Sequence, residues 1–347
     1  MKLAMSVNYS GDFKADVQRV QDLEAAGLDL VWIAEAYSFD AVSQVGYLAA
    51  KTSTIEIGTG ILNVFSRTAT AMAQTGAGCD YVSDGRFVLG LGASGPQVIE
   101  GFHGVPYAHP MPRIRDYIEV CRMTWRREPV VYKGTAVTIP LPPGEGTGLG
   151  KPLKLINHPK RADIPIFWAS VKGKSVAETA RLADGWLPIF FDPRKANDVW
   201  GADLARGREK RDPSLGALQI SAGGACAIGD EYAGDKADAI LDRLRPQLAL
   251  YIGGMGARGK NFYNDICVAY GYPDEAKVIQ DLYLDGRKEE AAAAVPRQLL
   301  ADISLVGSEG DVAEQIAALK EAGVSHLQVN PMTADPVKTI EQVKALI

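Results

Sequence analysis

The sequence predicts a (β/α)8 barrel, an α/β fold in which eight parallel strands close into a barrel inside a ring of helices. Short apolar segments with strand character alternate with amphipathic helical segments along most of the 347 residues. Short loops between them are typical of parallel strands joined by right-handed crossovers. A doubly wound open sheet is the alternative, but such a sheet seldom needs eight alternations.

The first part of the chain sets this pattern. Residues 2–7 alternate in polarity and are rich in strand formers. Residues 13–26 place Val17, Val20 and Leu23 at helical spacing, and Gly27 follows as a stop signal. Residues 28–34 are almost continuously apolar, as expected for a parallel strand covered by helices on both faces.

The same reasoning extends along the chain. Further strands are expected from Ile55 onward and at 86–91, 164–169, 186–190, 218–228 and 326–330. Further helices are expected at 41–50, 70–82, 114–126, 175–183, 193–210, 236–251 and 312–322.

Two segments interrupt the alternation. Residues 129–163 are rich in proline and glycine, and residues 252–303 are rich in alanine and tyrosine with small helices. Because the repeat resumes after each segment, we interpret both as insertions into one domain that spans 1–347. They are expected to cover the mouth of the barrel and to exclude water from it.

Composition excludes several classes of function. The net charge of −5 and the lack of a basic stripe argue against a nucleic-acid partner. No apolar run is long enough to span a membrane, and the polar start does not resemble a signal peptide, so a cytoplasmic protein is expected. The four cysteines are expected to be buried free thiols. The four histidines lack ligand spacing, so no metal site is predicted.

In such a barrel the active site lies at the carboxyl ends of the strands. Here those ends are glycine-rich, apolar and aromatic, as in GTGILNV at 58–64 and GLGASG at 90–95. They offer no Ser-His-Asp group, no carboxylate pair and no metal cluster. This composition suits a large flat cofactor that carries out the chemistry while the protein orients it.

Five stretches also match a known family. They are LVWIAEAY at 30–37, IEIGTGILNV at 55–64, YVSDGRFVLGLGASGP at 81–96, PIFWASVKGKSVAETARLADGWLPIF at 165–190 and VGSEGDVAEQIAALKEAGVSHLQV at 306–329. In these stretches the chain resembles the bacterial-luciferase-like family, specifically its coenzyme F420-dependent oxidoreductases. It looks most like an actinobacterial subgroup similar to methylenetetrahydromethanopterin reductase and F420-dependent glucose-6-phosphate dehydrogenase.

The resemblance implies where the cofactor binds. In the family the third strand ends in a bulge with a non-proline cis peptide under the deazaflavin ring, which here matches Gly60–Ile61, followed by Asn63. The loop at the ring and its polar edge matches Gly92, Ala93 and Ser94. From the residues alone, the first stretch could equally be an ordinary β-bulge at the barrel rim. The alternative for the second stretch is a tight turn before the next helix.

The resemblance also implies a phosphate site after the fifth strand. That loop matches Ala169, Ser170, Val171, Lys172 and Gly173, and it precedes a helix whose first N–H groups suit an anion. A plain helix cap by Ser175 is the alternative. Another wall of the pocket matches Pro188 and Ile189, for which core packing is the alternative.

Proton transfer is less well defined. Glu35 matches an acidic residue that contacts the ring in the family, and with Tyr37 it is the predicted catalytic pair. Tyr9 and His103 are further candidates. Some family members carry a histidine where Ala36 stands and a glutamate where Ala93 stands, so a histidine–glutamate mechanism for sugar-phosphate oxidation is in doubt.

The predicted function is therefore an F420-dependent oxidoreductase that transfers a hydride between the cofactor and a small organic substrate. An FMN-dependent monooxygenase and a cofactor-binding protein without turnover are the alternatives. The resemblance also implies a homodimer, with the helices after the first three strands as the contact.

Overall fold

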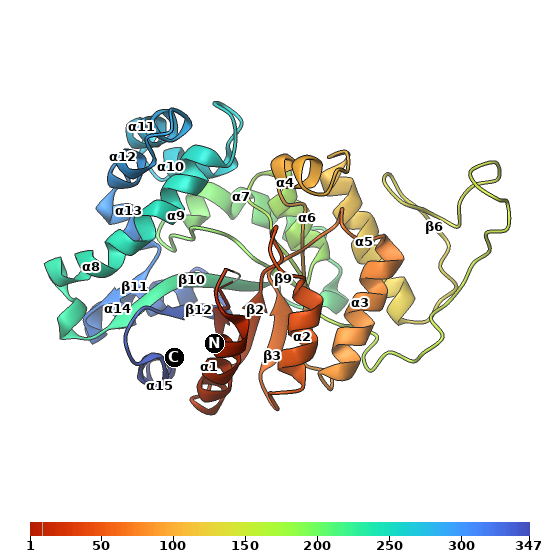
Figure 1. The fold of residues 1–347 in the computed structure, drawn as a ribbon, viewed down its shortest axis with the longest axis horizontal. Helices are drawn as coiled ribbons and strands as arrows, with labels where there is room; N and C mark the ends of the chain where they lie inside the picture. Colours follow the sequence, from red (N-terminus) through yellow and green to blue (C-terminus); the bar gives the residue numbers. More distant parts are fainter. Residues whose placement is uncertain (9) are drawn as a thin grey trace.

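The structure, a computed structural model, describes residues 1–8 and 10–347. Tyr9, one of the proton-transfer candidates, lies outside the described residues. In the described chain, eight parallel strands form a closed barrel, since each pairs with the next and β10 pairs with both β9 and β12. The predicted (β/α)8 barrel is confirmed (Figure 1). Its strands are β1 (Lys2–Ser6), β2 (Leu30–Ile33), β3 (Glu56–Thr59), β5 (Phe87–Gly92), β8 (Ile166–Trp168), β9 (Gly185–Trp186), β10 (Gln219–Ile228) and β12 (His326–Pro331).

The outer helices follow the expected order. Several begin at side-chain caps: Asp12 accepts hydrogen bonds from the N–H groups of Lys14 and Ala15, and Ser308 forms a capping box with Asp311. The helices around the barrel are α1 (Phe13–Ala25), α2 (Ala41–Ala49), α3 (Ala69–Val82), α5 (Pro110–Trp125), α6 (Lys174–Leu182), α7 (Ala196–Arg208), α14 (Glu309–Glu321) and α15 (Pro336–Ala345).

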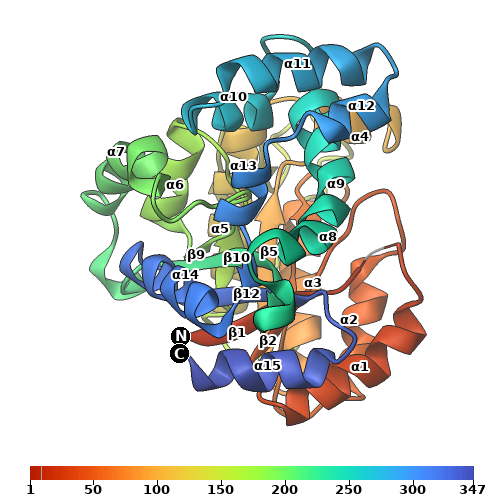
Figure 2. The same cartoon turned by 90° about the vertical axis from the view of Figure 1, so that its left-hand side faces the viewer.

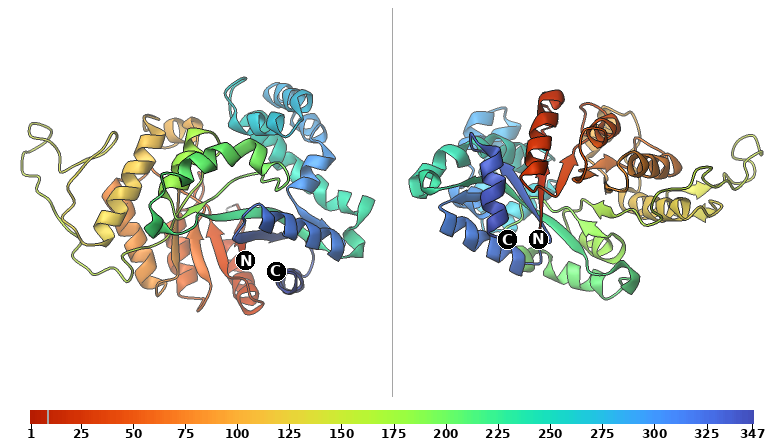
Figure 3. Two further views of the ribbon diagram at one scale, coloured as in Figure 1. Left: turned by 180° about the vertical axis from the view of Figure 1, so that it is seen from behind. Right: turned by 90° about the horizontal axis from the view of Figure 1, so that it is seen from below.

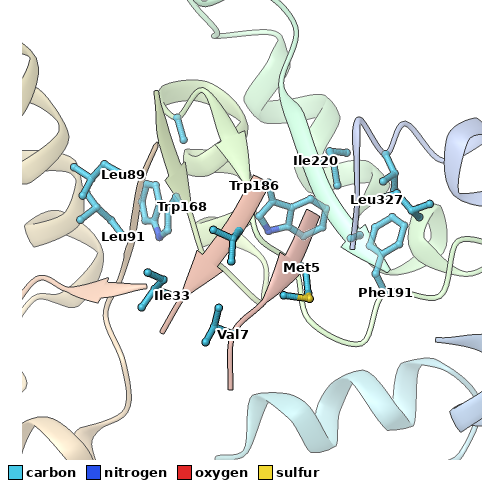
Figure 4. Packing of buried hydrophobic residues seen from close by; sticks show 14 of the residues in the cluster. Met5, Val7, Ile33, Leu89, Leu91, Trp168, Trp186, Phe191, Ile220 and Leu327 are labelled. Atoms are coloured by element: carbon cyan, nitrogen blue, oxygen red, sulfur yellow. The ribbon is translucent and has the colours of Figure 1, made fainter. Parts of the chain in front are cut away.

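Alternating residues of the strands form two cores. Ala4, Leu30, Trp32, Val88 and Phe167 pack together inside the barrel, with the Trp32 and Phe167 rings 5.3 Å apart. These rings need glycine on neighbouring strands, because a Cβ at residue 58 would lie 2.4 Å from Trp32 and one at residue 185 would lie 2.2 Å from Phe167. The other strand face packs against the helices. Figure 4 shows part of that larger core, including Leu89, Leu91, Trp168, Trp186 and Phe191.

The first insertion does not lie over the strand ends. It carries the hairpin β6 (Tyr132–Lys133) and β7 (Thr138–Ile139), and it is held from outside the barrel by Asp116 of α5, which accepts hydrogen bonds from Tyr132, Ala136 and Val137. Further along, Arg161 donates to the buried Asp80 of α3. Between these two anchors the segment projects away from the barrel (Figures 1 and 3). The expectation that this insertion covers the mouth is wrong, because it follows a helix and so leaves from the opposite end of the barrel.

The second insertion is more structured than expected. The predicted helix 236–251 is broken into short turns that run into a π-helical turn at 250–254, and a chain of helices crosses one end of the molecule (Figure 2). The insertion carries α10 (Phe262–Ala269), α11 (Pro273–Leu284), α12 (Lys288–Ala293) and α13 (Arg297–Asp302). Before it lie α8 (Asp238–Leu241), α9 (Arg245–Ala249) and 310 turns at 213–215, 230–232, 234–237 and 242–244.

Several elements were not predicted. The last helix, α15, and the hairpin β6–β7 are among them. The others are β4 (Leu62–Asn63), which pairs with the end of β5, α4 (Pro96–Gly101) and β11 (Leu305–Gly307), which pairs with the end of β10. Apart from α15, each is too short to give a periodic pattern. The predicted strand 186–190 ends at Trp186, because the chain turns sharply at Phe190.

Two further expectations concern the cysteines and membrane-spanning helices. The four cysteines are buried free thiols, as predicted. Among the helices of residues 1–8 and 10–347, none combines the length and the apolar character needed to cross a bilayer.

Candidate active site

Three strand ends that the sequence assigned to the cofactor meet in space. A Cβ added at Gly92, the last residue of β5, would lie 2.9 Å from Cδ1 of Ile61 and 3.7 Å from Cβ of Ala169. Ile61 is half-buried, and the Gly60–Ile61 peptide bond is cis, as the resemblance implied. The side chain of Ile61 therefore lies between the ends of β5 and β8, and only glycine at position 92 leaves room for it.

The loop after β8 is anchored from below by two buried tryptophans. The indole N–H of Trp186 donates to the Ser170 carbonyl, and that of Trp200 donates to the Val171 carbonyl, both at 2.9 Å. The two indoles pack edge to face with centroids 5.3 Å apart. Because both carbonyls are drawn into the core, the loop has a fixed path toward the start of α6.

The start of α6 has no side-chain cap. Its N-cap is Gly173, at φ 51°, and this residue supplies no side-chain hydrogen bond. The predicted alternative, capping by Ser175, is not what forms: the Ser175 hydroxyl instead donates to the Lys172 carbonyl at 2.6 Å. The N–H groups of Ser175 and Val176 donate to the carbonyls of Lys172 and Gly173, at 3.1 Å each, so only the N–H groups that precede them can be candidates for an anion. A Cβ at Gly173 would meet nothing within 4 Å, so the space beside the cap is open.

Glu35 ends β2, but its carboxylate is already engaged. Arg67 donates to both of its oxygens, at 2.6 and 2.9 Å, and the Ala41 N–H donates to one of them at 3.1 Å. Arg67 also pairs with Asp40 at 2.9 Å. The hydrogen bond to Glu35 is the largest of the effects that raise the pKa of Arg67. Glu35 therefore acts in this structure as the anchor of an arginine, and Arg67 is paired rather than a free surface cation.

The comparisons with known proteins give the family. The sequence model described as luciferase-like monooxygenase matches residues 2–326. The chain belongs to this family.

Luciferase-like relatives match over almost the whole chain. A Mycobacterium tuberculosis protein with the provisional name coenzyme F420-dependent oxidoreductase is 39% identical over 347 residues, which cover 98% of both chains. Among solved structures, the coenzyme F420-dependent tetrahydromethanopterin reductase from Methanopyrus kandleri has a TM-score of 0.81 at 20% identity, covering 100% of this chain and 98% of that one. An F420-dependent secondary alcohol dehydrogenase has a TM-score of 0.73 at 18% identity and covers 100% and 98%. These two structures share the luciferase-like fold.

Two predicted proton-transfer residues lie at the rim of this luciferase-like barrel. Tyr37 is 68% exposed, and its ring lies 6.3 Å from that of Phe102, which also contacts His103. Neither is brought into the cluster of strand ends around Ile61. His103 is not the solvated loop residue that its sequence context suggested, because its Nε2 is buried without a hydrogen-bond partner among the described residues.

Tyr107, which forms an aromatic wall with Phe65 near the strand ends, was missed by the sequence reasoning. The ring of Tyr107 stacks on Phe65 at 5.1 Å, and its hydroxyl donates to the carbonyl of Ser94, which has a positive φ of 57°. The guanidinium of Arg113 lies 4.9 Å from the Phe65 ring centroid. Burial, with a smaller effect from nearby Tyr263, raises the pKa of Tyr107 to about 12, so this phenol stays neutral. No local motif marked these residues, because they come from three separate segments.

The second insertion shapes the wall after β9. Pro188 and Ile189 are half-buried, and Ile189 packs on the main core. Phe190 follows with a positive φ of 52°, a conformation that is unfavourable for a side chain of this size. It is held by Tyr270, whose hydroxyl donates to the Phe190 carbonyl at 2.7 Å.

The predicted loop residues Asn63 and Lys172 both have partners in the protein. The side-chain oxygen of the buried Asn63 accepts hydrogen bonds from the N–H groups of Phe65 and Ser66, which fixes the turn after β4. Lys172 pairs with Asp265 of α10 at 2.5 Å, and both are substantially exposed. The insertion thus touches the loop after β8 through an ion pair.

Proposed function

We propose that this luciferase-like protein is an F420-dependent oxidoreductase that transfers a hydride between the deazaflavin ring and a small organic substrate. The observation that carries the proposal is the convergence of Ile61, Gly92 and Ala169 beside the open N-terminus of α6. The 39% identity to a relative with an F420-dependent name supports the same cofactor.

The residues present fit the group. The half-buried Ile61 and the glycine behind it offer an apolar surface for a flat ring, and the α6 cap at Gly173 offers N–H groups for its phosphate. When bound, the deazaflavin supplies the two-electron hydride chemistry. The protein's own residues orient the ring, and the second insertion restricts water through Phe190 and its partners.

Proton transfer is proposed for a residue other than Glu35, because three donors already occupy its carboxylate. Tyr37 and His103 stay predictions as proton-transfer groups. The homodimer through the helices after the first three strands also stays a prediction, which sedimentation at micromolar concentration would test.

The test is a titration of the purified protein with oxidised F420 and, separately, with FMN, followed by ligand fluorescence. We expect F420 to bind more tightly than FMN, and Gly173→Asp to abolish binding by placing a carboxylate at the phosphate site. Gly286→Asp is the matched control, because Gly286 has a φ of 83° and open surroundings but lies between α11 and α12. Preference for FMN would favour the monooxygenase alternative, and binding of neither would refute the proposal.

A further inference from the structure

Arg113 carries its charge at the start of α5. It lies in the first turn of this helix, which begins at Pro110. The helices of a (β/α)8 barrel begin at the carboxyl ends of the strands, so Arg113 lies at the mouth of the barrel. There its guanidinium contacts Phe65, whose ring also stacks on Tyr107.

Arg113 differs from other half-buried arginines in having no ion-pair partner within residues 1–8 and 10–347. Its Nε is buried and has no hydrogen-bond partner among these residues. By contrast, Arg122 and Arg161 each pair with a carboxylate, and Arg86 donates to three carbonyl oxygens. The charge of Arg113 is therefore left without a counterion in the described chain.

The polar groups around Arg113 do not replace a counterion. Burial raises the pKa of Tyr117, and the nearby Arg113 guanidinium opposes part of that rise. This phenol is neutral, and its hydroxyl already donates to the Arg67 carbonyl at 2.5 Å. The carboxylate of Glu100 accepts a hydrogen bond from the Tyr107 N–H at 3.2 Å and forms no ion pair with Arg113 among the described contacts.

A half-buried cation in this position is unfavourable by itself. Its partial removal from water costs free energy that a counterion normally offsets. The first turn of a helix adds to this cost, because the N-terminal end of the helix dipole is positive. The Phe65 ring, 4.9 Å from the guanidinium, gives a cation–π contact but no negative charge. A bound anion would relieve both costs.

The surroundings of Arg113 indicate which kind of anion fits. Nε is the nitrogen that is buried without a partner, so the two terminal amino groups stay accessible. Such a planar fork matches the two oxygens of a carboxylate. Beside it, the stacked rings of Phe65 and Tyr107 form an aromatic surface, and Tyr107 stays neutral because burial raises its pKa to about 12. A carboxylate on a flat apolar body suits this combination.

We propose that Arg113 binds the carboxylate of the substrate, and that the substrate is an aromatic carboxylic acid. This inference rests on the proposed function, to which it adds the class of substrate. The aromatic body packs along Phe65 and Tyr107, and the Tyr107 hydroxyl is itself fixed to the carbonyl of Ser94 in the loop assigned to the cofactor ring. Arg113 is then a specificity-determining residue that selects the acid over a neutral analogue.

The experiment compares three aromatic acids, each with its own primary amide, as ligands of the protein loaded with F420. Benzoate, phenylacetate and 3-phenylpropionate are titrated against benzamide, phenylacetamide and 3-phenylpropionamide by ligand-observed NMR at low salt. At least one acid should bind about tenfold more tightly than its amide, because charge-assisted hydrogen bonds are roughly twice as strong as neutral ones.

Variants of Arg113 give the decisive comparison. Arg113→Gln should abolish the preference for the acid and leave the affinities for the amides and for F420 unchanged. Arg113→Lys keeps the charge and should retain part of the preference. The matched control is Arg19→Gln, because Arg19 also has a buried Nε without a partner among the described residues but lies on α1. This control should keep the full preference.

The outcomes separate this inference from the proposed function. If no acid binds more tightly than its amide, or if the preference survives in Arg113→Gln, the inference alone is overturned. A loss of F420 affinity in Arg113→Gln would assign the arginine to the cofactor and would likewise overturn it. If the wild type does not bind F420, the proposed function fails, and the assignment of the acid as substrate fails with it.

Discussion

The carboxylate of Glu35 gives the sharpest test of the site. The sequence alone made it a catalytic candidate, whereas the structure surrounds it with donors from Arg67 and Ala41. The side chains of Glu35 and Arg67 are 10% and 18% exposed, so the pair is partly shielded from water. We expect Glu35→Gln to act mainly on stability.

The magnitude follows from the contacts. A glutamine can keep one oxygen toward Arg67 and the Ala41 N–H, but its amide would then face the other N–H group of Arg67. One charge-assisted hydrogen bond is lost, and the glutamine amide N–H faces an N–H group of Arg67. Together these changes should lower the free energy of unfolding by about 2–3 kcal/mol. For a chain of 347 residues, this loss corresponds to a fall in Tm of roughly 3–4 °C.

The assay pairs thermal unfolding with F420 titration. Asp40→Asn is the matched control: Asp40 is 51% exposed in its pair with Arg67, and asparagine can still cap α2 at Ser43. It should cost less than about 1 kcal/mol. The reasoning would be refuted if Glu35→Gln left Tm unchanged while F420 binding was lost, because Glu35 would then contact the cofactor directly.

Three further changes probe other parts of the fold. Trp200→Phe leaves the Val171 carbonyl without its donor, so it should cost about 1–3 kcal/mol in urea unfolding and weaken F420 binding several-fold. Tyr270→Phe removes the hydrogen bond to Phe190 and should likewise weaken binding in titration, while an unchanged affinity would show that Phe190 does not shape the site. Burial, followed by the charge of Lys2, lowers the pKa of His326 to about 4. Between pH about 6.5 and 4 the unfolded chain therefore binds more protons than the folded chain. The free energy of unfolding should decrease by about 3 kcal/mol as the pH is lowered through this range. In urea unfolding at several pH values, His326→Gln should reduce that slope.

The barrel could be predicted because its signals are local. Continuous apolar strands such as 30–33 and helices with a cap and a glycine stop, such as 13–25, repeat along the chain. The loops between them then place the strand ends at one mouth without further information. The direction of each strand side chain was harder to predict: alternation buries Trp168 under the helices, whereas Phe167 fills the barrel.

The parts of the site that sequence reasoning missed depend on contacts between distant segments. The sequence marks Arg67 only as a cation near a strand end, and its pairing with Glu35 appears only when the fold brings the two side chains together. Tyr107 is fixed by Phe65 and Ser94, from two other strand ends. The insertions show the same limit, because their composition gave helices and turns but not the end of the barrel on which each one lies.

The two lysines beside the proposed phosphate site show the same difference between what local sequence indicates and what the fold determines. Sequence could mark Lys172 and Lys174 as equivalent cations beside a helix start. The fold makes them different, since Lys172 is paired with Asp265 from the second insertion while Lys174 lines a pocket between α5, α6 and α7. An anion at the helix start would thus meet one cation that is already neutralised and another that lines this pocket.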